Sequence, residues 1–213
     1  MESGPARLRE GMRRASAREV SDETLARRAL AGDRSAFEIL VERHQDRVYG
    51  LARRLTRSPA DAEEVLQETF MNAYRRLGAF RGEAKFSTWL YRIATNSARM
   101  LRRGQSRRPA EPLDAYLPRF DGQGRHARDV DHARAADADE LLDRRRLARH
   151  AREALERLPE RYRVPFVLRD LEEMPTAEVA SVLGVSSDLV RQRVHRARLM
   201  LRGYLSHLVG VEP

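Results

Sequence analysis

The stretch from Ser58 to Arg103, SPADAEEVLQETFMNAYRRLGAFRGEAKFSTWLYRIATNSARMLRR, decides the fold. Its first half repeats apolar residues at intervals of three and four, which places them on one stripe of a helix: Ala62, Val65, Leu66, Thr69, Phe70, Ala73, Tyr74 and Leu77. Its second half does the same with Trp89, Leu90, Ile93, Ala94, Ser97 and Leu101. Ser58 suits the N-cap position, Pro59 suits the first helical position, and Gly78 suits a stop. The stretch therefore predicts two amphipathic helices joined by a short loop.

Charge is sorted between these two helices. The first is acidic at its start, with Asp61, Glu63 and Glu64. From Arg81 to Arg108 there are eight Lys or Arg residues and one acid, Glu83. A solvated helix face explains many such runs, but here the basic residues alternate with Phe80, Phe86, Trp89 and Tyr91. Because cations bind phosphates and aromatic rings stack on unpaired bases, the second helix and its loop favour a nucleic-acid partner.

The overall composition also favours a nucleic-acid partner. The 213 residues carry a formal net charge of +9 and contain no cysteine. The basic balance favours a polyanionic partner, and the missing cysteine excludes disulfides and thiolate metal sites. No apolar run approaches the roughly 20 residues of a membrane span, and the N-terminus lacks the apolar core of a signal peptide. Strand signals are almost absent, so we expect an all-α protein.

The chain divides by pattern into four segments. Residues 1–20 have little periodicity and predict a disordered tail. Residues 21–103 predict a helix bundle, in which Ser21 or Asp22 caps the first helix and Asp33 caps the second. Pro and Gly interrupt residues 104–138, which predicts a flexible linker. Residues 139–207 predict a second helical domain. His44, on an apolar stripe, is better explained as a partly buried histidine than as a metal ligand, because no second ligand lies at helical spacing.

The second domain contains a candidate helix-turn-helix. Pro165 lies inside a predicted helix and should kink it or force an irregular turn. After it, Glu178 to Leu183 predict a short helix, Gly184 a turn, and Ser186 or Ser187 the cap of the next helix. Ordinary helical hairpins share this spacing. The last helix, however, carries Arg191, Arg193, Arg196, Arg198 and Arg202 against one acid, Asp188, and such a helix suits the major groove of DNA.

These stretches resemble a known family. DAEEVLQETFMNAYRRL followed by FRGEAKFSTWLYRIATNSARMLRR closely resembles the promoter-melting domain of extracytoplasmic-function (ECF, group 4) sigma factors of the sigma-70 family. The segment from ALERLPERYRVPFVLRD to VHRARLMLRGYL resembles the second conserved domain of the same family, which binds the −35 promoter element. This chain departs from the family at Pro175, where a Ser or Thr cap is common. It also departs at Asp188 and Leu189, where many members have Gly-Thr.

The resemblance implies a function and partners. It implies an alternative sigma factor that binds the beta and beta-prime subunits of core RNA polymerase and directs transcription initiation at −10 and −35 promoter elements. It also implies an anti-sigma factor, often membrane-tethered, that would hold this cytoplasmic protein at the inner membrane. The acids from Asp129 to Glu140 in the linker would mimic RNA phosphates in a basic channel, although a solvated tether explains them nearly as well. No small-molecule substrate is implied.

The resemblance also assigns residues. The set for core polymerase is Asp61, Glu64, Gln67, Glu68 and Asn72. The set for the −10 element is Arg81, Lys85, Phe86, Thr88, Asn96, Arg99, Arg102 and Arg103, with the loop from Arg81 to Thr88 capturing a flipped base. The set for the −35 element is Ser187, Arg191, Gln192, Arg193, His195, Arg196 and Arg198. Within it, Arg191, Gln192 and His195 would touch base edges and the other arginines would bind phosphates, above a packed side of Val190, Val194 and Leu199.

Two other classes of protein were weighed against the sigma factor. A free-standing helix-turn-helix regulator would bind operators without polymerase. The helix that follows Ser58, however, has an acidic start, which suits docking on a protein and repels DNA. An enzyme is not expected, because the sequence has no paired-carboxylate pocket, no Gly-rich phosphate loop and no His cluster. We therefore expect no catalytic residue, no metal and no cofactor.

Overall fold

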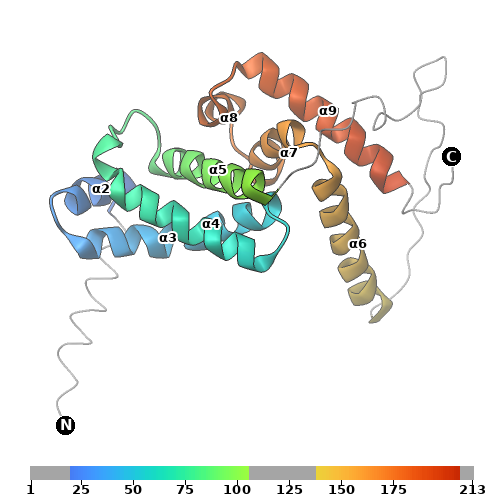
Figure 1. Ribbon diagram of the computed structural model, residues 1–213, viewed down its shortest axis with the longest axis horizontal. Helices are drawn as coiled ribbons and strands as arrows, with labels where there is room; N and C mark the ends of the chain where they lie inside the picture. Colours follow the sequence, from blue (N-terminus) through green and yellow to red (C-terminus); the bar gives the residue numbers. More distant parts are fainter. Residues whose placement is uncertain (1–19, 106–137, 207–213) are drawn as a thin grey trace, which may run out of the picture. The chain divides into compact units, whose positions relative to one another are not determined.

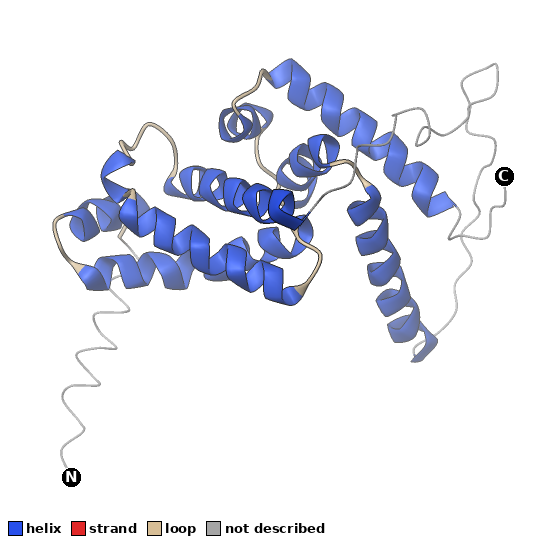
Figure 2. Ribbon diagram, viewed as in Figure 1, coloured by secondary structure: helices blue, strands red, loops and turns tan. Residues whose placement is uncertain are grey.

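A computed structural model describes residues 20–105 and 138–206, and every element in these two ranges is a helix (Figures 1 and 2). The elements are α2 (Asp22–Leu30), α3 (Arg34–Leu55), α4 (Pro59–Arg75), η1 (Leu77–Ala79), α5 (Phe86–Gln105), α6 (Ala138–Arg157), α7 (Glu160–Phe166), η3 (Val167–Leu171), α8 (Thr176–Leu183) and α9 (Ser187–Ser206). The all-α expectation is confirmed. The chain divides into two compact units: the N-terminal unit is built on most of α2–α5, and the C-terminal unit is built on α6–α9 together with Arg53–Ser58 and the end of α5 from Arg102. The predicted tail and nearly all of the predicted linker lie outside the described residues.

Local capping sets where the first helices of the N-terminal unit begin. The Ser21 hydroxyl accepts the Thr24 N–H at 3.3 Å, so Ser21 is the N-cap of α2. The Asp33 carboxylate accepts the Ala36 N–H at 3.3 Å before α3, as the sequence predicted. The Ser35 hydroxyl and the Arg28 guanidinium also donate to Asp33, at 2.6 and 2.7 Å, and together they lower the pKa of this carboxyl to about 2.

The core of the N-terminal unit lies between α3, α4 and α5. Leu40, Leu51, Val65, Leu90 and Ala94 are almost completely buried there. The predicted stripe of α4 is too wide: its centre is buried, but Leu66 and Phe70 are half-buried and the Tyr74 side chain is 51% exposed. A helix in a small bundle buries only the part of its surface that faces its neighbours, so residues at the two edges of the stripe remain accessible.

His44 is buried, as expected of a histidine on an apolar stripe. Its Nε2 lies 2.7 Å from an Asp22 carboxylate oxygen, and its ring packs 5.5 Å from the ring of Phe86, centre to centre. Arg43 donates to the other oxygen of Asp22 at 2.6 Å. His44 therefore links α2, α3 and the start of α5.

The C-terminal unit is organised around a proline and a left-handed glycine. Pro165 has no N–H to donate, and the helix that contains it continues as the π-helical turn η3 directly after α7. The predicted irregularity at Pro165 thus takes the form of a π-helix. Gly184 ends α8 with φ 66° and ψ 39°, a conformation that favours glycine, and the next residue leads into the turn before α9. Pro175 precedes α8 without any side-chain cap.

Candidate nucleic-acid and protein interfaces

The helix α9 presents one polar stripe outward above an apolar base. Arg191, Gln192 and His195 are exposed, and His195 lies one turn after Arg191 and Gln192 on the outer face. The buried side is formed by Val190, Val194, Ala197 and Met200. The predicted packed residue Leu199 is only half-buried, because Met200 is the residue in phase with Val190, Val194 and Ala197. The Ser186 hydroxyl accepts the Leu189 N–H at 3.2 Å and so caps α9, while Ser187 is its first residue.

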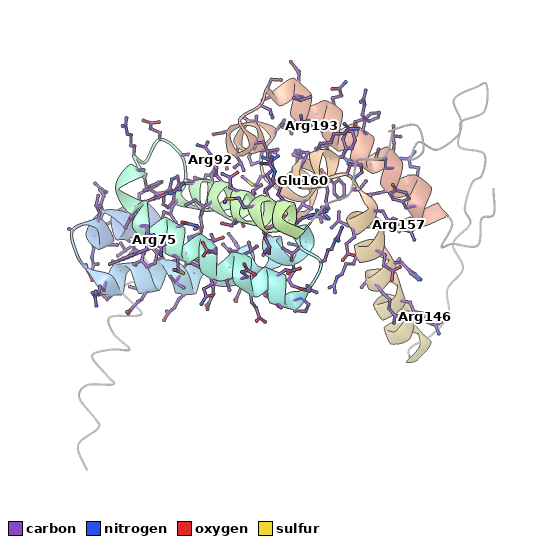
Figure 3. The ribbon with its side chains drawn as sticks, viewed as in Figure 1. Arg75, Arg92, Arg146, Arg157, Glu160 and Arg193 are labelled. Carbon is purple, nitrogen blue, oxygen red and sulfur yellow. The ribbon has the colours of Figure 1, made fainter. Side chains whose placement is uncertain are left out.

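The arginines of α9 differ in what they bind. Arg198 donates from Nε and Nη2 to the two carboxylate oxygens of Asp170, at 2.7 and 2.8 Å. This pair raises the pKa of Arg198 and joins α9 to η3. Arg198 was predicted to bind phosphate; in the structure two of its five N–H donors are used on Asp170, which holds the guanidinium against η3. Arg193 (Figure 3) is half-buried on one flank of α9, and Arg196 is half-buried as well. Arg191 pairs with Asp188 one turn earlier.

A second polar face runs along α5. Arg81 and Lys85 are exposed in the loop before the helix, and the predicted residues Asn96, Arg99 and Arg103 follow one another along one side of it. Arg92 lies one turn before Asn96 on this side and is exposed (Figure 3), although it was not in the predicted set. Helical spacing alone, at i and i+4, would have identified it.

Arg102 lies elsewhere on α5. Its Nη1 donates to the backbone carbonyl of Leu55 at 3.4 Å, at the end of α3. Because the last carbonyls of a helix have no partner within the helix, this hydrogen bond satisfies one of them. Arg102 therefore has a structural role that the sequence prediction, which placed it on DNA, did not include.

Two of the predicted −10 contacts are buried. Phe86 is 1% exposed and Thr88 is 3% exposed, so neither side chain reaches the surface that a base would need. Phe86 instead packs against Phe80 and Trp89 at ring-centre distances of 5.4 and 5.6 Å, and Phe80 lies 5.4 Å from Trp89. We call Phe80, Phe86 and Trp89 the aromatic cluster. It anchors the two ends of the loop 81–85, a packing role that the sequence did not indicate, and the contact of Phe86 with the −10 element stays a prediction.

The exposed face of α4 is acidic. Glu64, Gln67 and Glu68 are exposed there, while Asp61 and Asn72 are half-buried, and the Asn72 amide donates to Glu68 at 3.1 Å. An open depression of about 500 Å³ lies on this helix and is lined by Glu63, Glu64, Leu66, Gln67 and Phe70. Leu66 and Phe70 had been assigned to the buried stripe, so the sequence reading missed the apolar part of this surface.

Among the side chains that the structure describes, in residues 20–104 and 146–205, no group of three or more His, Asp or Glu is arranged to hold a metal ion. In the same two ranges, no helix has the length and apolar character needed to cross a membrane.

Comparison with known proteins gives consistent matches over most of the chain. The family model "Sigma-70 region 2" matches residues 40–108, and "Sigma-70, region 4" matches residues 149–201. The ECF RNA polymerase sigma-E factor of Haemophilus influenzae is 36% identical over 199 residues, which cover 91% of this chain and 100% of that protein. The sigma-E factor of Escherichia coli K12 is 34% identical over 181 residues, or 84% and 92% of the two chains.

Solved structures agree in fold. CnrH, in complex with the cytosolic domain of CnrY, has a TM-score of 0.63 and 29% identity, covering 88% of this chain and 99% of that chain. The sigma factor RpoE of Bartonella quintana, in complex with the anti-sigma factor NepR, has a TM-score of 0.56 and 20% identity, covering 80% and 96%.

Proposed function

This chain belongs to the extracytoplasmic-function group of sigma-70 family sigma factors, and from that premise we propose how its surfaces share the steps of transcription initiation. It is an alternative sigma factor: its partners are core RNA polymerase and promoter DNA, and it directs transcription initiation. The observation that carries the residue assignments is the separation of charge. The helix α4 is acidic outside, whereas α5 and α9 are basic outside.

The helix α9 reads the −35 element. Its exposed Arg191 can donate two hydrogen bonds to guanine O6 and N7, and Gln192 can pair with adenine N6 and N7. His195 completes the stripe that faces the bases. Arg193 and Arg196 flank it and bind phosphates. Arg198 is not part of this set, because Asp170 already holds it.

The loop 81–85 and the polar face of α5 act on the −10 element. Arg81 and Lys85 bring positive charge to the loop, and Arg92, Asn96, Arg99 and Arg103 follow the strand along the helix. Unpairing a base costs a few kcal/mol, so the loop has to stay in place while it captures one. The aromatic cluster supplies that rigidity, and its two half-buried members, Phe80 and Trp89, are the rings with surface left for a base.

The depression on α4 binds core polymerase. Glu63, Glu64 and Glu68 repel DNA and attract a basic protein surface, while Leu66 and Phe70 offer apolar contact between them. An anti-sigma factor is a further partner in this proposal, since the sigma factor RpoE of Bartonella quintana, which shares this fold, was solved in complex with one. The protein would then be cytoplasmic, at the inner membrane whenever that partner is membrane-tethered.

In-vitro transcription tests the whole proposal. Core polymerase with this chain should initiate at a set of genomic fragments on which core alone is silent, and mapped start sites should share two upstream elements at a fixed spacing. The chain without core should give no stable footprint on the same fragments. Specific operator binding by the chain alone, with no core-dependent transcripts, would instead identify a free-standing regulator.

A further inference from the structure

The first turn of α9 holds an acid beside the main candidate for base recognition. The Arg191 Nη2 group pairs with the Asp188 Oδ1 atom, three residues earlier on the same face. Both side chains are largely in solvent, with 87% of Asp188 and 63% of Arg191 exposed. Asp188 is also the only acid of α9.

Affinity for DNA does not explain Asp188. A carboxylate at a helix N-terminus stabilises the helix by interacting with its dipole, but it repels a phosphate that would otherwise bind the free N–H groups there. In a helix that carries Arg191, Arg193 and Arg196 toward DNA, this acid lowers the attraction to every sequence alike. The effect of Asp188 on Arg191 is different, because the carboxylate changes the orientation of that one side chain.

Arg191 has donors to spare. A guanidinium carries five N–H donors in a planar fork, and a bidentate contact with guanine uses two of them. The pair with Asp188 involves Nη2 and leaves the rest of the fork available. A free arginine side chain loses rotamer entropy when it is fixed in one geometry. An acid that fixes part of this geometry beforehand reduces the loss on binding.

We propose that Asp188 is a positioning residue for −35 recognition: it holds the Arg191 guanidinium in the orientation that reads one base pair, and so lowers overall affinity while raising discrimination. The inference rests on the proposed base readout by Arg191. It gives a role to a residue at which this chain departs from the Gly-Thr of many relatives.

The second Arg–Asp pair of α9 shows how this arrangement differs from a structural one. Arg198 uses two donors on Asp170, whose side chain is only 15% exposed, and the pair joins two elements. Arg191 pairs within its own helix with a carboxylate in solvent. The first arrangement fixes α9 to η3, whereas the second leaves both partners facing outward.

The test is a binding series with holoenzyme made from the full chain, on a promoter and all its single-base −35 variants, at two salt concentrations. For Asp188→Ala we expect about a three- to fivefold loss of discrimination at the base pair that Arg191 reads, the upper part of the range for an exposed ion pair. Binding to all variants should become tighter. Asp188→Asn removes the charge but keeps an acceptor, so it should give the same tightening and keep most of the discrimination. Thermal melts should confirm that each variant is folded.

Two further variants separate the possible outcomes. Glu173→Gln removes an exposed carboxylate outside α9 and should leave the ranking of sequences unchanged. In an Arg191→Ala background, Asp188→Ala should cause no further loss of discrimination. If Asp188→Ala and Asp188→Asn shift every sequence by the same factor, Asp188 acts only through charge and the inference is wrong. If Arg191→Ala itself lowers binding uniformly, the proposed readout fails, and the positioning role fails with it.

Discussion

The recognition helix α9 and the loop 81–85 present their candidate DNA contacts in different ways. In α9 a regular helix places Arg191, Gln192 and His195 outward, and the apolar residues beneath them are set by the same period. The loop has no such period. Its position depends on the aromatic cluster, which joins η1 to the start of α5. A contact surface on a helix should therefore tolerate single changes one by one, whereas the loop should fail as a whole when its anchor is lost.

The largest expected effect is the loss of stability when the aromatic cluster is disrupted. Phe86→Ala should lower the stability of the N-terminal unit by about 3–5 kcal/mol, because it removes a fully buried ring. The chain has a single tryptophan, Trp89, 5.6 Å from Phe86, so fluorescence during denaturation reports on this unit alone. Arg191→Ala, on the surface of α9, should leave that transition unchanged. A loss below about 1 kcal/mol for Phe86→Ala would mean that the loop does not depend on this ring.

The next largest effect is on binding to core polymerase, on which the −10 and −35 contacts depend equally. Replacing Glu64 and Glu68 by Arg should weaken binding to core polymerase by about 2 kcal/mol, roughly thirtyfold, because like charges would face each other at the contact. Both −10 and −35 occupancy should fall together, since neither surface acts without core. Glu38→Arg, on the exposed side of α3, is the matched control. Unchanged core affinity of the double variant would remove α4 from the docking surface.

Within α9 we expect two classes of arginine. Arg191→Ala should relax base preference at one position, at a cost of about 1–3 kcal/mol against the wrong base. Arg196→Ala should weaken all sequences alike and reduce the salt dependence by about one phosphate contact. Titrations over the single-base −35 variants measure both. If the two variants behave identically, the exposed stripe and the flank of α9 do not differ in role.

The smallest effect concerns Arg198. Its replacement by Ala should destabilise the C-terminal unit by about 1 kcal/mol, because Asp170 loses a bidentate partner. The salt slope of DNA binding should stay the same, since this guanidinium contributes no phosphate contact. Circular dichroism melts measure the change in stability, and salt titrations of DNA binding measure the slope. A reduced slope would restore Arg198 to the phosphate-binding set.

The residues of α9 and of the aromatic cluster also show which features could be predicted from the sequence and which could not. Periodicity predicted the buried Val190 and Val194 and the exposed Arg191, because a helix fixes the face of every residue. It did not predict the pairing of Arg198 with Asp170, which lie 28 residues apart in the chain. It also placed Phe86 on DNA, because an aromatic residue in a basic loop has the same local pattern whether it faces a base or two other rings. For such residues, tertiary packing decides the role.

The division between reading and melting is the central claim, and one experiment tests it directly. Residues 81–85 are replaced by Gly and Ser, leaving Phe86 and Thr88 in place so that the core is kept. Holoenzymes with the original and the altered loop are then compared on one promoter by −35 protection and by permanganate reactivity of −10 thymines. We expect protection at −35 to persist while thymine reactivity disappears. Normal thymine reactivity with the altered loop would contradict the claim.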